Sequence, residues 1–167
     1  MPTIQQDKFK IGQGFDIHKF DQNSMNASSL ILGGVHISDH PKLQGHSDGD
    51  VLAHAISDAL LGAAGLGDLG KYFPDTDPKW ANADSMELLC SVVAMLRQAG
   101  WEPVNIDCTV IAQTPNLTPY KPLMAEQLSQ ACSTEVNVKG TSPETMGSLG
   151  SKEGIACLAI VLIKPIR

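Results

Sequence analysis

The sequence lacks the features that mark several large classes of protein. No stretch in its 167 residues approaches the roughly 20 consecutive apolar residues of a membrane-spanning helix. Only 12 Lys and Arg residues stand against 18 Asp and Glu residues, so no positive excess is present to attract nucleic acid or an anionic membrane. We therefore expect neither as a partner. The first residues have neither the apolar core of a signal peptide nor the Arg- and Ser-rich composition of a transit peptide, which favours a cytoplasmic protein of the bacterial type.

Closely spaced cysteines and late histidines are also missing. The four cysteines form no CxxC pair; they are Cys90, Cys108, Cys132 and Cys157. Because each lies in an apolar or helical stretch, we expect small core residues in a reducing compartment rather than a disulfide framework. All five histidines lie in the first third of the chain, and none follows His54. Chemistry that needs an imidazole is therefore confined to that first third.

The order of the expected elements indicates one domain, residues 1–167, of the α+β class. We expect strands at residues 11–17, 29–37 (interrupted at Gly33 and Gly34), 104–111, 135–139 and 154–164. We expect helices from a cap at Ser47 or Asp48 to about Ala64, from a cap at Asp84 or Ser85 to Gly100, and over residues 119–132. This order predicts a mixed, largely antiparallel sheet with helices on one face.

The last expected strand, residues 154–164, is apolar on both faces. An antiparallel sheet with helices on one side usually leaves its other side in water. The second apolar face therefore needs a cover, and a chain this short has few elements left to supply one. Either another subunit covers this face, or the strand lies between two layers of the same chain.

Asp16 and His18 form a D-x-H pair in an expected strand, so both side chains point to the same face and can reach one ion. His54 lies with Asp50 and Asp58 on a polar stripe of an otherwise apolar helix. One carboxylate and two imidazoles leave a fourth coordination position open, which is typical of a catalytic zinc site. Asp50 and Asp58 are candidates to orient the imidazoles. A solvated histidine produces the same spacing, so the pattern alone leaves both interpretations open.

The neighbouring sequence is strongly acidic. Between Leu43 and Leu96 the only Lys or Arg residues are Lys71 and Lys79, against eight Asp and Glu residues. A phosphorylated substrate would be repelled there unless divalent ions reversed the local field. The loop at residues 73–78 adds carboxylates suited to hydroxyls or exocyclic amines, although Pro and Asp are also ordinary turn residues.

Residues 139–144 follow an expected strand and have the features of a helix start. Thr141 and Glu144 have the spacing of a capping box, and Pro143 suits a first helical turn. Free backbone N–H groups and two hydroxyls at such a start form an anion site, and Glu144 is a candidate ligand for a metal ion between two phosphates. Many helices begin this way, so this motif alone has low specificity.

Together and in this order, the motifs resemble the 2-C-methyl-D-erythritol 2,4-cyclodiphosphate synthase family of the non-mevalonate isoprenoid pathway. The resemblance extends from Ile11 to Ile163. Its most specific stretches are residues 14–18 (GFDIH), 46–50 (HSDGD), 54–62 (HAISDALLG), 67–70 (GDLG) and 73–78 (FPDTDP). Their combination is far more specific than any one of them.

The resemblance implies a homotrimer of ferredoxin-like α/β subunits with active sites between neighbours. It implies Zn²⁺ bound by Asp16, His18 and His54, and a second ion, Mg²⁺ or Mn²⁺, bound between two phosphates with help from Glu144. The implied substrate is a cytidine diphosphate-linked small molecule, 4-diphosphocytidyl-2-C-methyl-D-erythritol 2-phosphate. Its 2-phosphate attacks the β-phosphorus, CMP leaves, and a cyclic diphosphate forms.

By the same matching, His46 and Ser142 would stabilise the transition state. The implied substrate contacts in the first half of the chain are Asp16, Ile17, His18, His46, Ser47, Asp68, Leu69, Gly70, Phe73, Pro74, Asp75, Thr76 and Asp77. Those expected from a neighbouring subunit, around the cytidine and its phosphate, are Ala112, Gln113, Thr114, Pro115, Asn116, Leu117, Thr118, Thr141, Ser142, Pro143 and Glu144.

The chain departs from the family pattern in places. Many bacterial members have Gly-Phe-Thr-Gly-Arg where this chain has Ser148 and Ser151 in residues 147–151 (GSLGS), and often Glu where it has Leu158. In those members the Arg and the Glu line a cavity on the trimer axis that can hold an isoprenoid diphosphate, so the resemblance does not carry that ligand over. A family Lys in the cytidine loop is Asn116 here.

Other classes fit the sequence less well. A metallophosphoesterase has a similar D-x-H…G-D opening, but it needs later histidines that this chain lacks. A non-haem iron oxygenase uses two His and one carboxylate in an all-β barrel, against which the helix carrying His54 argues. A trimeric small-molecule-binding module with a structural metal stays open, and a closed shell of four ligands would favour it.

Overall fold

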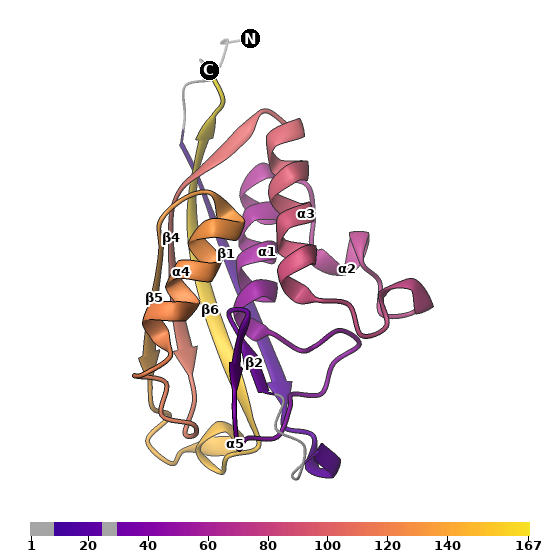
Figure 1. The fold of residues 1–167 in the computed structure, drawn as a ribbon. Coiled ribbons are helices and arrows are strands. Elements are labelled where there is room, and N and C mark those ends of the chain that lie inside the picture. Colours follow the sequence, from indigo (N-terminus) through magenta and orange to yellow (C-terminus); the bar gives the residue numbers. More distant parts are fainter. Residues whose placement is uncertain (1–8, 25–29) are drawn as a thin grey trace.

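A mixed four-stranded sheet forms the centre of the computed structural model, which describes residues 9–24 and 30–167 (Figure 1). Its strands are β1 (Lys10–Lys19), β4 (Trp101–Ile111), β5 (Val136–Thr141) and β6 (Gly154–Pro165). They are ordered β1-β6-β4-β5, so β1 and β5 are the two edges. Strand β6 is antiparallel to both of its neighbours, and β4 and β5 are parallel. The predicted α+β class and mixed sheet are confirmed.

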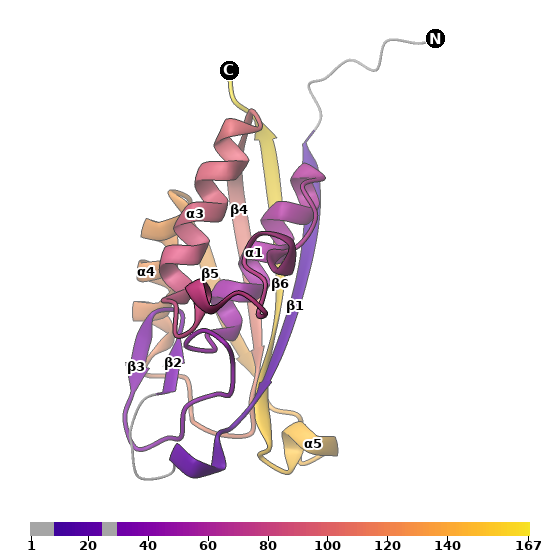
Figure 2. The same cartoon turned by 90° about the vertical axis from the view of Figure 1, so that its right-hand side faces the viewer.

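The three long helices all lie on one face of this sheet (Figure 2). They are α1 (Val51–Ala64), α3 (Ser85–Gln98) and α4 (Lys121–Cys132). The shorter elements are the 3-10 helices η1 (Gln22–Ser24) and η2 (Pro78–Trp80), the helices α2 (Leu69–Tyr72) and α5 (Gly147–Gly150), and the strands β2 (Leu30–Leu32) and β3 (Val35–Ile37). None of the helices in the described ranges is long and apolar enough to cross a membrane.

Helix α1 is the central element of the core. It packs against β1, β6 and α3, and its side chains Leu52, Ile56 and Leu60 are completely buried. Helix α3 contributes Leu89 and Leu96, which lie two turns apart and therefore on the same helix face. This packing holds α1 directly over β1, the strand that carries the predicted D-x-H pair.

Residues along β1 alternate between the two faces of the sheet. Gly12 and Gly14 are buried under α1, and Asp16 and His18 continue the same face toward the end of the strand. Phe15 points to the other face and is exposed. The absence of side chains at Gly12 and Gly14 lets the helix approach the strand closely, while the last residues of the strand stay accessible for polar side chains.

The face of the sheet opposite the helices carries exposed apolar side chains on β1 and β6. Ile11, Phe15 and Ile17 of β1 are 72%, 51% and 48% exposed, and Ile160 of the central strand β6 is 47% exposed. Figure 2 shows α1, α3 and α4 together on the other side of the sheet. Within the described chain, β6 is therefore not enclosed between two layers, which removes one of the two alternatives for this strand. We call this surface, formed by Ile11, Phe15, Ile17 and Ile160, the open sheet face.

Helix α1 begins later than predicted. Its N-cap is Asp50 rather than Ser47 or Asp48, and the Asp50 carboxylate accepts hydrogen bonds from the N–H groups of Leu52 and Ala53. The same carboxylate accepts two more from the turn between β2 and β3. The Asp50 carboxylate therefore both caps α1 and holds its start against that turn, which explains why the helix begins after Asp50.

The expected strand at residues 29–37 is a hairpin. Strands β2 and β3 pair on either side of Gly33 and Gly34, which have φ angles of 57° and 73°. Two consecutive residues in the left-handed region are typical of a tight hairpin turn, so the glycines end one strand and begin the next. Residue 29 lies outside the described residues.

The predicted helix start at Thr141–Glu144 is wrong. Thr141 is the last residue of β5, and Glu144 and Thr145 have φ angles of 52° and 62°, in the left-handed region that a right-handed helix excludes. The Ser142 hydroxyl accepts a hydrogen bond from the N–H of Glu144, which forms a turn. Helix α5 begins only at Gly147. No helix N-terminus therefore supports an anion site at these residues.

The cysteine prediction holds for three residues of four. Cys108, Cys132 and Cys157 are buried, whereas Cys90 is exposed on the solvent side of α3. All four are free thiols. Burial raises the pKa of Cys132 to about 12, so this thiol is unreactive at neutral pH.

Candidate metal centre

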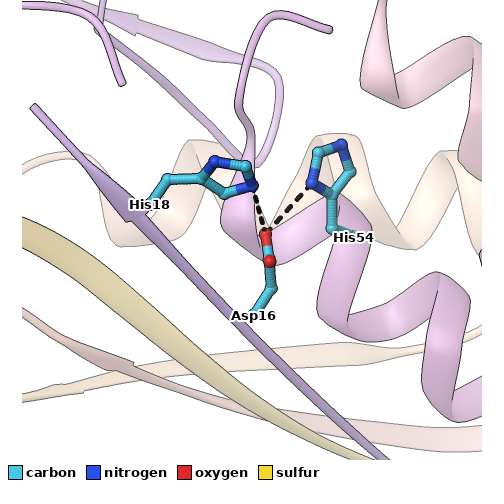
Figure 3. Close-up of side chains that lie close together, drawn as sticks. All are labelled: Asp16, His18 and His54. Carbon is cyan, nitrogen blue, oxygen red and sulfur yellow. Dashed lines mark hydrogen bonds and ion pairs between the residues drawn. The ribbon is translucent and has the colours of Figure 1, made fainter. Parts of the chain in front are cut away.

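Asp16 and His18 of β1 and His54 of α1 come together beside the edge strand of the sheet (Figure 3). Nε2 of His18 and Nδ1 of His54 each lie 3.0 Å from Oδ2 of Asp16. One ligand atom from each residue lies within 4.8 Å of the other two. The D-x-H alternation places two donors on the helix face of β1, and the close packing of α1 adds the third. The structure thus brings together all three residues selected from the sequence as ligands of the first metal ion.

The main chain holds the ring of His18 from behind. Nδ1 of His18 donates a hydrogen bond to the carbonyl oxygen of Gln44, so Nδ1 carries a proton and Nε2 is the nitrogen that faces the centre. The hydrogen bond with Asp16 raises the pKa of His18. A metal ion at this centre therefore competes with a proton for Nε2.

Asp16 is the anionic member of the group. Burial raises the pKa of its carboxyl, but the hydrogen bonds and charges of His18 and His54 outweigh burial and hold the net pKa well below the usual range. The carboxylate is ionised at neutral pH and offers one oxygen to both rings. A cation at the same position replaces the protons that the two imidazoles would otherwise share with it.

The donor set fits a divalent cation of the zinc type. In a tetrahedral zinc site with bonds of roughly 2.0–2.2 Å, neighbouring ligand atoms are about 3.3 Å apart. The two separations of 3.0 Å around Asp16 Oδ2 are close to that value. Two imidazole nitrogens and one carboxylate oxygen are ligands that zinc accepts, and three protein ligands leave one position for another group.

Two hydroxyl groups lie behind the ring of His54. Nε2 of His54 is 2.8 Å from Oγ of Ser85 and 3.1 Å from Oγ of Ser47. Ser85 is the first residue of α3, and sequence reasoning considered it only as a helix cap. The groups that orient the imidazoles are thus a backbone carbonyl for His18 and serine hydroxyls for His54.

Asp50 and Asp58 form no hydrogen bond with either imidazole among the described residues. Asp50 caps α1, and Oδ1 of Asp58 accepts a hydrogen bond of 2.7 Å from the N–H of Leu69. That these two carboxylates orient the imidazoles therefore stays a prediction. Burial raises the pKa of each carboxyl, which the N–H donors partly offset.

A pocket of about 570 Å³ opens over the three ligands. The predicted substrate contacts in its lining are Asp16, His18, His46, Ser47, Leu69, Gly70, Phe73, Pro74 and Asp75, with His54 beside them. Sequence reasoning missed three further lining residues, Gly45, Trp80 and Leu88. The ring of Trp80 meets that of Phe73 edge-on, with centroids 4.8 Å apart and an interplanar angle of 85°. This aromatic pair forms an apolar wall opposite the polar ligands.

The other predicted contacts of the first half lie outside the lining. The carboxylate of Asp68 accepts a hydrogen bond from the N–H of Lys71 and caps α2. The carbonyl oxygen of Asp77 lies 3.1 Å from Nε2 of His46 and holds that ring in the pocket. Thr76 belongs to the same turn, and the side chain of Ile17 lies on the open sheet face.

The predicted contacts of the second half lie near the opposite edge of the sheet. Residues 112–118 follow β4, and residues 142–144 follow the edge strand β5. The N–H of Ala112 donates a hydrogen bond of 3.2 Å to the carbonyl of Thr141, so the two segments begin side by side. Neither segment lines the pocket, and Glu144 is not in the ligand group. One chain therefore carries two separate groups of predicted site residues.

In the part of the chain that the structure describes, no Lys or Arg side chain lines the pocket. Nζ of Lys71 donates a hydrogen bond to the carbonyl of Leu66, and Nζ of Lys79 lies 4.3 Å from the centre of the Trp80 ring. Among the described residues, the pocket thus has carboxylates and imidazoles but no permanent cation of its own. An anionic ligand there needs a divalent ion to offset the carboxylates.

The chain is similar to proteins of known activity along most of its length. The sequence profile of the YgbB family matches residues 9–164. The 2-C-methyl-D-erythritol 2,4-cyclodiphosphate synthase of Halorhodospira halophila is 49% identical over 158 residues, which are 93% of this chain and 95% of that protein.

Two solved structures have the same fold. The bifunctional IspDF of Campylobacter jejuni matches with a TM-score of 0.90 and 44% identity, over 96% of this chain and 43% of that one. This chain thus spans less than half of the bifunctional protein. The IspF of Plasmodium falciparum, a CDP complex, matches with a TM-score of 0.82 and 31% identity, over 98% of this chain and 100% of that one.

Proposed function

The chain belongs to the YgbB family, and from that premise we propose how its residues divide the work of 2-C-methyl-D-erythritol 2,4-cyclodiphosphate synthesis. The enzyme converts 4-diphosphocytidyl-2-C-methyl-D-erythritol 2-phosphate into the 2,4-cyclodiphosphate and CMP, a step of isoprenoid biosynthesis. The observation that carries the proposed division is the ligand triad of Asp16, His18 and His54 at the floor of the pocket.

We assign Zn²⁺ to this triad, with one ion per subunit. When bound there, the cation neutralises phosphate charge and polarises a phosphoryl oxygen. The chain's own part is to present two imidazole lone pairs and one carboxylate in a preformed arrangement, as the distances of 3.0 Å indicate. Glu144, exposed on the turn after β5, is the proposed ligand of a second ion, Mg²⁺ or Mn²⁺, that enters with the diphosphate.

The pocket residues position the methylerythritol part. Leu69, Gly70 and the aromatic wall of Phe73 enclose its carbon skeleton, and Asp75 accepts hydrogen bonds from its hydroxyls. His46 lies at the same pocket, with its ring held by the carbonyl of Asp77. We assign to His46, together with Ser142, the stabilisation of charge on the oxygens of the reacting phosphorus.

The reaction moves one phosphoryl group within the substrate. An oxygen of the 2-phosphate forms a bond to the β-phosphorus, and the bond from that phosphorus to the bridging oxygen breaks. The electron pair of the broken bond stays on the α-phosphate of the departing CMP. The protein needs no nucleophile of its own for this step, so its residues contribute position and electrostatic stabilisation.

The two groups of site residues require a second copy of the chain. The metal centre lies at β1, and Ser142 and Glu144 follow β5, which is the opposite edge of the sheet. Three strand spacings separate these edges, about 14 Å. A site that contains both groups is completed when the β5 edge of one subunit meets the β1 edge of the next. Such a contact joins different surfaces, and it forms a ring when the rotation between neighbours closes; we propose that this ring is the homotrimer of the family.

The open sheet face supports this assembly. Its four large apolar side chains are about half exposed or more in the single chain. Exposed large apolar side chains grouped on one face are typical of an interface between proteins. In the proposed trimer the three open faces meet around the axis, and residues 112–118 and 141–144 of one subunit reach the cytidine and its phosphate at the neighbouring metal centre.

Phosphorus NMR tests the activity directly. The protein is incubated with the diphosphocytidyl substrate, Zn²⁺ and Mg²⁺, and we expect signals of CMP and of the cyclic diphosphate to grow as the substrate disappears. The variant His54→Ala is expected to lose both Zn²⁺ and activity, whereas His36→Ala, at an exposed histidine, keeps both. Absence of both products at every metal ratio would refute the assignment.

A further inference from the structure

We propose that Asp48 and Ser85 form a hydrogen-bond relay that accepts the Nε2 proton of His54, which leaves Nδ1 as the nitrogen that binds the metal ion. The inference rests on the proposed metal centre and adds two positioning residues to it. Neither lies among the three ligands. The relay decides which nitrogen of His54 carries the proton when the metal ion is bound.

The hydroxyl of Ser85 lies at the meeting point of three polar side chains. Ser85 is completely buried. Its Oγ is 2.5 Å from Oδ1 of Asp48, 2.8 Å from Nε2 of His54 and 3.2 Å from Oγ of Ser47. A hydroxyl has one proton to donate and two lone pairs that accept, so these contacts compete for the single proton.

The carboxylate of Asp48 decides the competition. An ionised carboxylate can only accept, and two oxygens 2.5 Å apart without a proton between them repel each other. The Ser85 proton therefore goes to Asp48, and the Ser85 oxygen is left as an acceptor. That oxygen then accepts from Nε2 of His54. When a cation occupies the centre, the lone pair of Nδ1 is left to face it, at the position 3.0 Å from Oδ2 of Asp16.

Backbone groups hold Asp48 in place. Its Oδ2 accepts a hydrogen bond of 3.1 Å from the N–H of Ser85, and its Oδ1 accepts one of 3.2 Å from the N–H of Asp50. The N–H of Asp48 donates to the carbonyl of Ala83. The relay therefore joins the segment that leads into α1 to the start of α3.

The hydroxyl of Ser85 is not needed to start its helix. The N-cap of α3 is Asp84, whose carboxylate accepts from the N–H groups of Met86 and Glu87. Alanine at position 85 keeps this cap and is a good helix former. The loss of the hydroxyl is therefore expected to act on His54 rather than on the fold.

The relay also explains why the two imidazoles differ. His18 is held through Nδ1 by the carbonyl of Gln44 and binds through Nε2, whereas His54 is held through Nε2 and binds through Nδ1. Without the hydroxyls behind it, the ring of His54 has Asp16 as its remaining acceptor. Its proton then moves to Nδ1 and occupies the position that the metal ion needs.

The test compares zinc affinity and the ring proton of His54 in four proteins. They are the wild type, Ser85→Ala, the double variant Ser47→Ala/Ser85→Ala, and the control Ser57→Ala. Ser57 is a buried serine on α1 whose hydroxyl donates to the carbonyl of Ala53 and forms no hydrogen bond with Asp16, His18 or His54 among the described residues. Zinc affinity is measured by competition with a chromophoric chelator. Nitrogen-15 NMR of labelled histidine in the zinc-loaded proteins observes the Nε2 proton.

We expect a protected Nε2 proton on His54 in the wild type and in Ser57→Ala. Zinc affinity should fall in the double variant by about 10- to 100-fold, the usual effect of removing a group that orients a ligand. The zinc affinity of Ser85→Ala should fall less, because the hydroxyl of Ser47 still offers an acceptor 3.1 Å from Nε2 of His54. In the double variant the Nε2 proton should exchange rapidly with water.

Three outcomes separate this inference from the metal centre itself. A wild-type protein that binds no Zn²⁺ contradicts the proposed centre. A wild-type protein that binds Zn²⁺, combined with a double variant of equal affinity and an equally protected Nε2 proton, overturns the relay and leaves the centre intact. A zinc-loaded wild type in which His54 carries its proton on Nδ1 also overturns the relay.

Discussion

Gly14 of β1 lies directly against the carbonyl group of Ala55 in α1: a Cβ atom on Gly14 would come within 1.9 Å of that oxygen. Gly12 has the same relation to the carbonyl of Ala59. Strand and helix therefore touch through their backbones, with no side chain between them. Because His54 precedes Ala55, this contact sets the distance from His54 to Asp16, and the metal centre depends on it.

Gly14→Ala is expected to weaken both the fold and the metal centre. The added methyl group collides with backbone atoms, which cannot rotate away, so α1 must move off the strand. Overpacking of this kind typically costs about 1–3 kcal/mol. We expect a lower free energy of unfolding for the metal-free protein in urea and a lower zinc affinity of the folded protein.

Gly62→Ala is the matched control for this substitution. Gly62 lies on α1, outside the residues that line the pocket, and a Cβ there would meet no atom within 4 Å. Alanine is favoured over glycine in a helix by roughly 0.5–1 kcal/mol, so this variant should be slightly more stable and bind zinc normally. Equal zinc affinities for the two variants would show that the close approach does not set the centre.

The three ligands were predictable because their placement follows from local periodicity. A strand returns to the same face every second residue, which pairs Asp16 with His18, and an amphipathic helix leaves a polar stripe for His54. The role of Ser85 was not predictable. Its contact with His54 spans 31 positions in sequence and depends on how α3 packs on α1. From sequence, Asp84 and Ser85 are equivalent as caps. Only the structure shows that Asp84 is the cap and that the hydroxyl of Ser85 is available for His54.

The predicted helix start at residues 141–144 failed for a similar reason. Its capping-box spacing is a local pattern, but long-range contacts decide the conformation. The N–H of Thr145 donates to the side chain of Gln113, and the backbone of Thr145 lies so close to Gly150 that a Cβ there would be 2.1 Å away. These contacts bend the chain into a turn. The sequence also could not decide whether a layer of the same chain covers the second face of β6. That depends on where all the other elements pack.

Asp58→Asn should change how stability depends on pH. Burial raises the pKa of Asp58 above its ordinary value of 3.8. The folded protein therefore holds this proton more tightly than the unfolded chain, and the wild type loses stability as pH rises from about 4 through the raised pKa. Asparagine keeps an acceptor for the N–H of Leu69 and removes the charge. In urea unfolding with EDTA present, the free energy of unfolding of the variant should increase relative to that of the wild type as pH rises.

Asp107→Asn is the control of opposite sign. Hydrogen bonds from Lys139 and Asn137 lower the pKa of Asp107, so its contribution is present at neutral pH and is lost as pH falls. The free energy of unfolding of this variant should be slightly lower than that of the wild type at neutral pH, and the difference should shrink in acid. The effect is small because the carboxylate is 42% exposed. The same pH trend in both variants would contradict the assignment for Asp58.

Trp80→Ala should weaken substrate binding without affecting zinc. The Trp80 ring supports Phe73 edge-on and closes the apolar wall of the pocket. Such an aromatic pair contributes about 1 kcal/mol, so we expect KM to rise roughly five- to tenfold. Trp101→Phe, at the start of β4 and outside the pocket, should keep the wild-type KM. A lower zinc affinity in Trp80→Ala would mean that the wall supports the ligands instead.

Ile160→Asp should dissociate the proposed trimer. Ile160 lies at the middle of the open sheet face on the central strand, where the charge would be buried against neighbouring subunits. Light scattering after gel filtration should give the mass of one chain, and activity should be lost. Leu123→Asp is the matched control, because Leu123 is similarly exposed, at 46%, but lies on α4. A trimeric Ile160→Asp protein would place the interface elsewhere.

Mixed oligomers test whether active sites lie between subunits. His54→Ala removes a metal ligand at the β1 edge, and Ser142→Ala removes a hydroxyl beyond the β5 edge. Each variant alone should be inactive because every site lacks one essential group. After equal amounts are unfolded together and refolded, about a quarter of the shared sites receive both intact halves by chance, so about a quarter of the wild-type activity should return. If each chain held a complete site, no mixture would regain activity, because every chain carries one of the two defects.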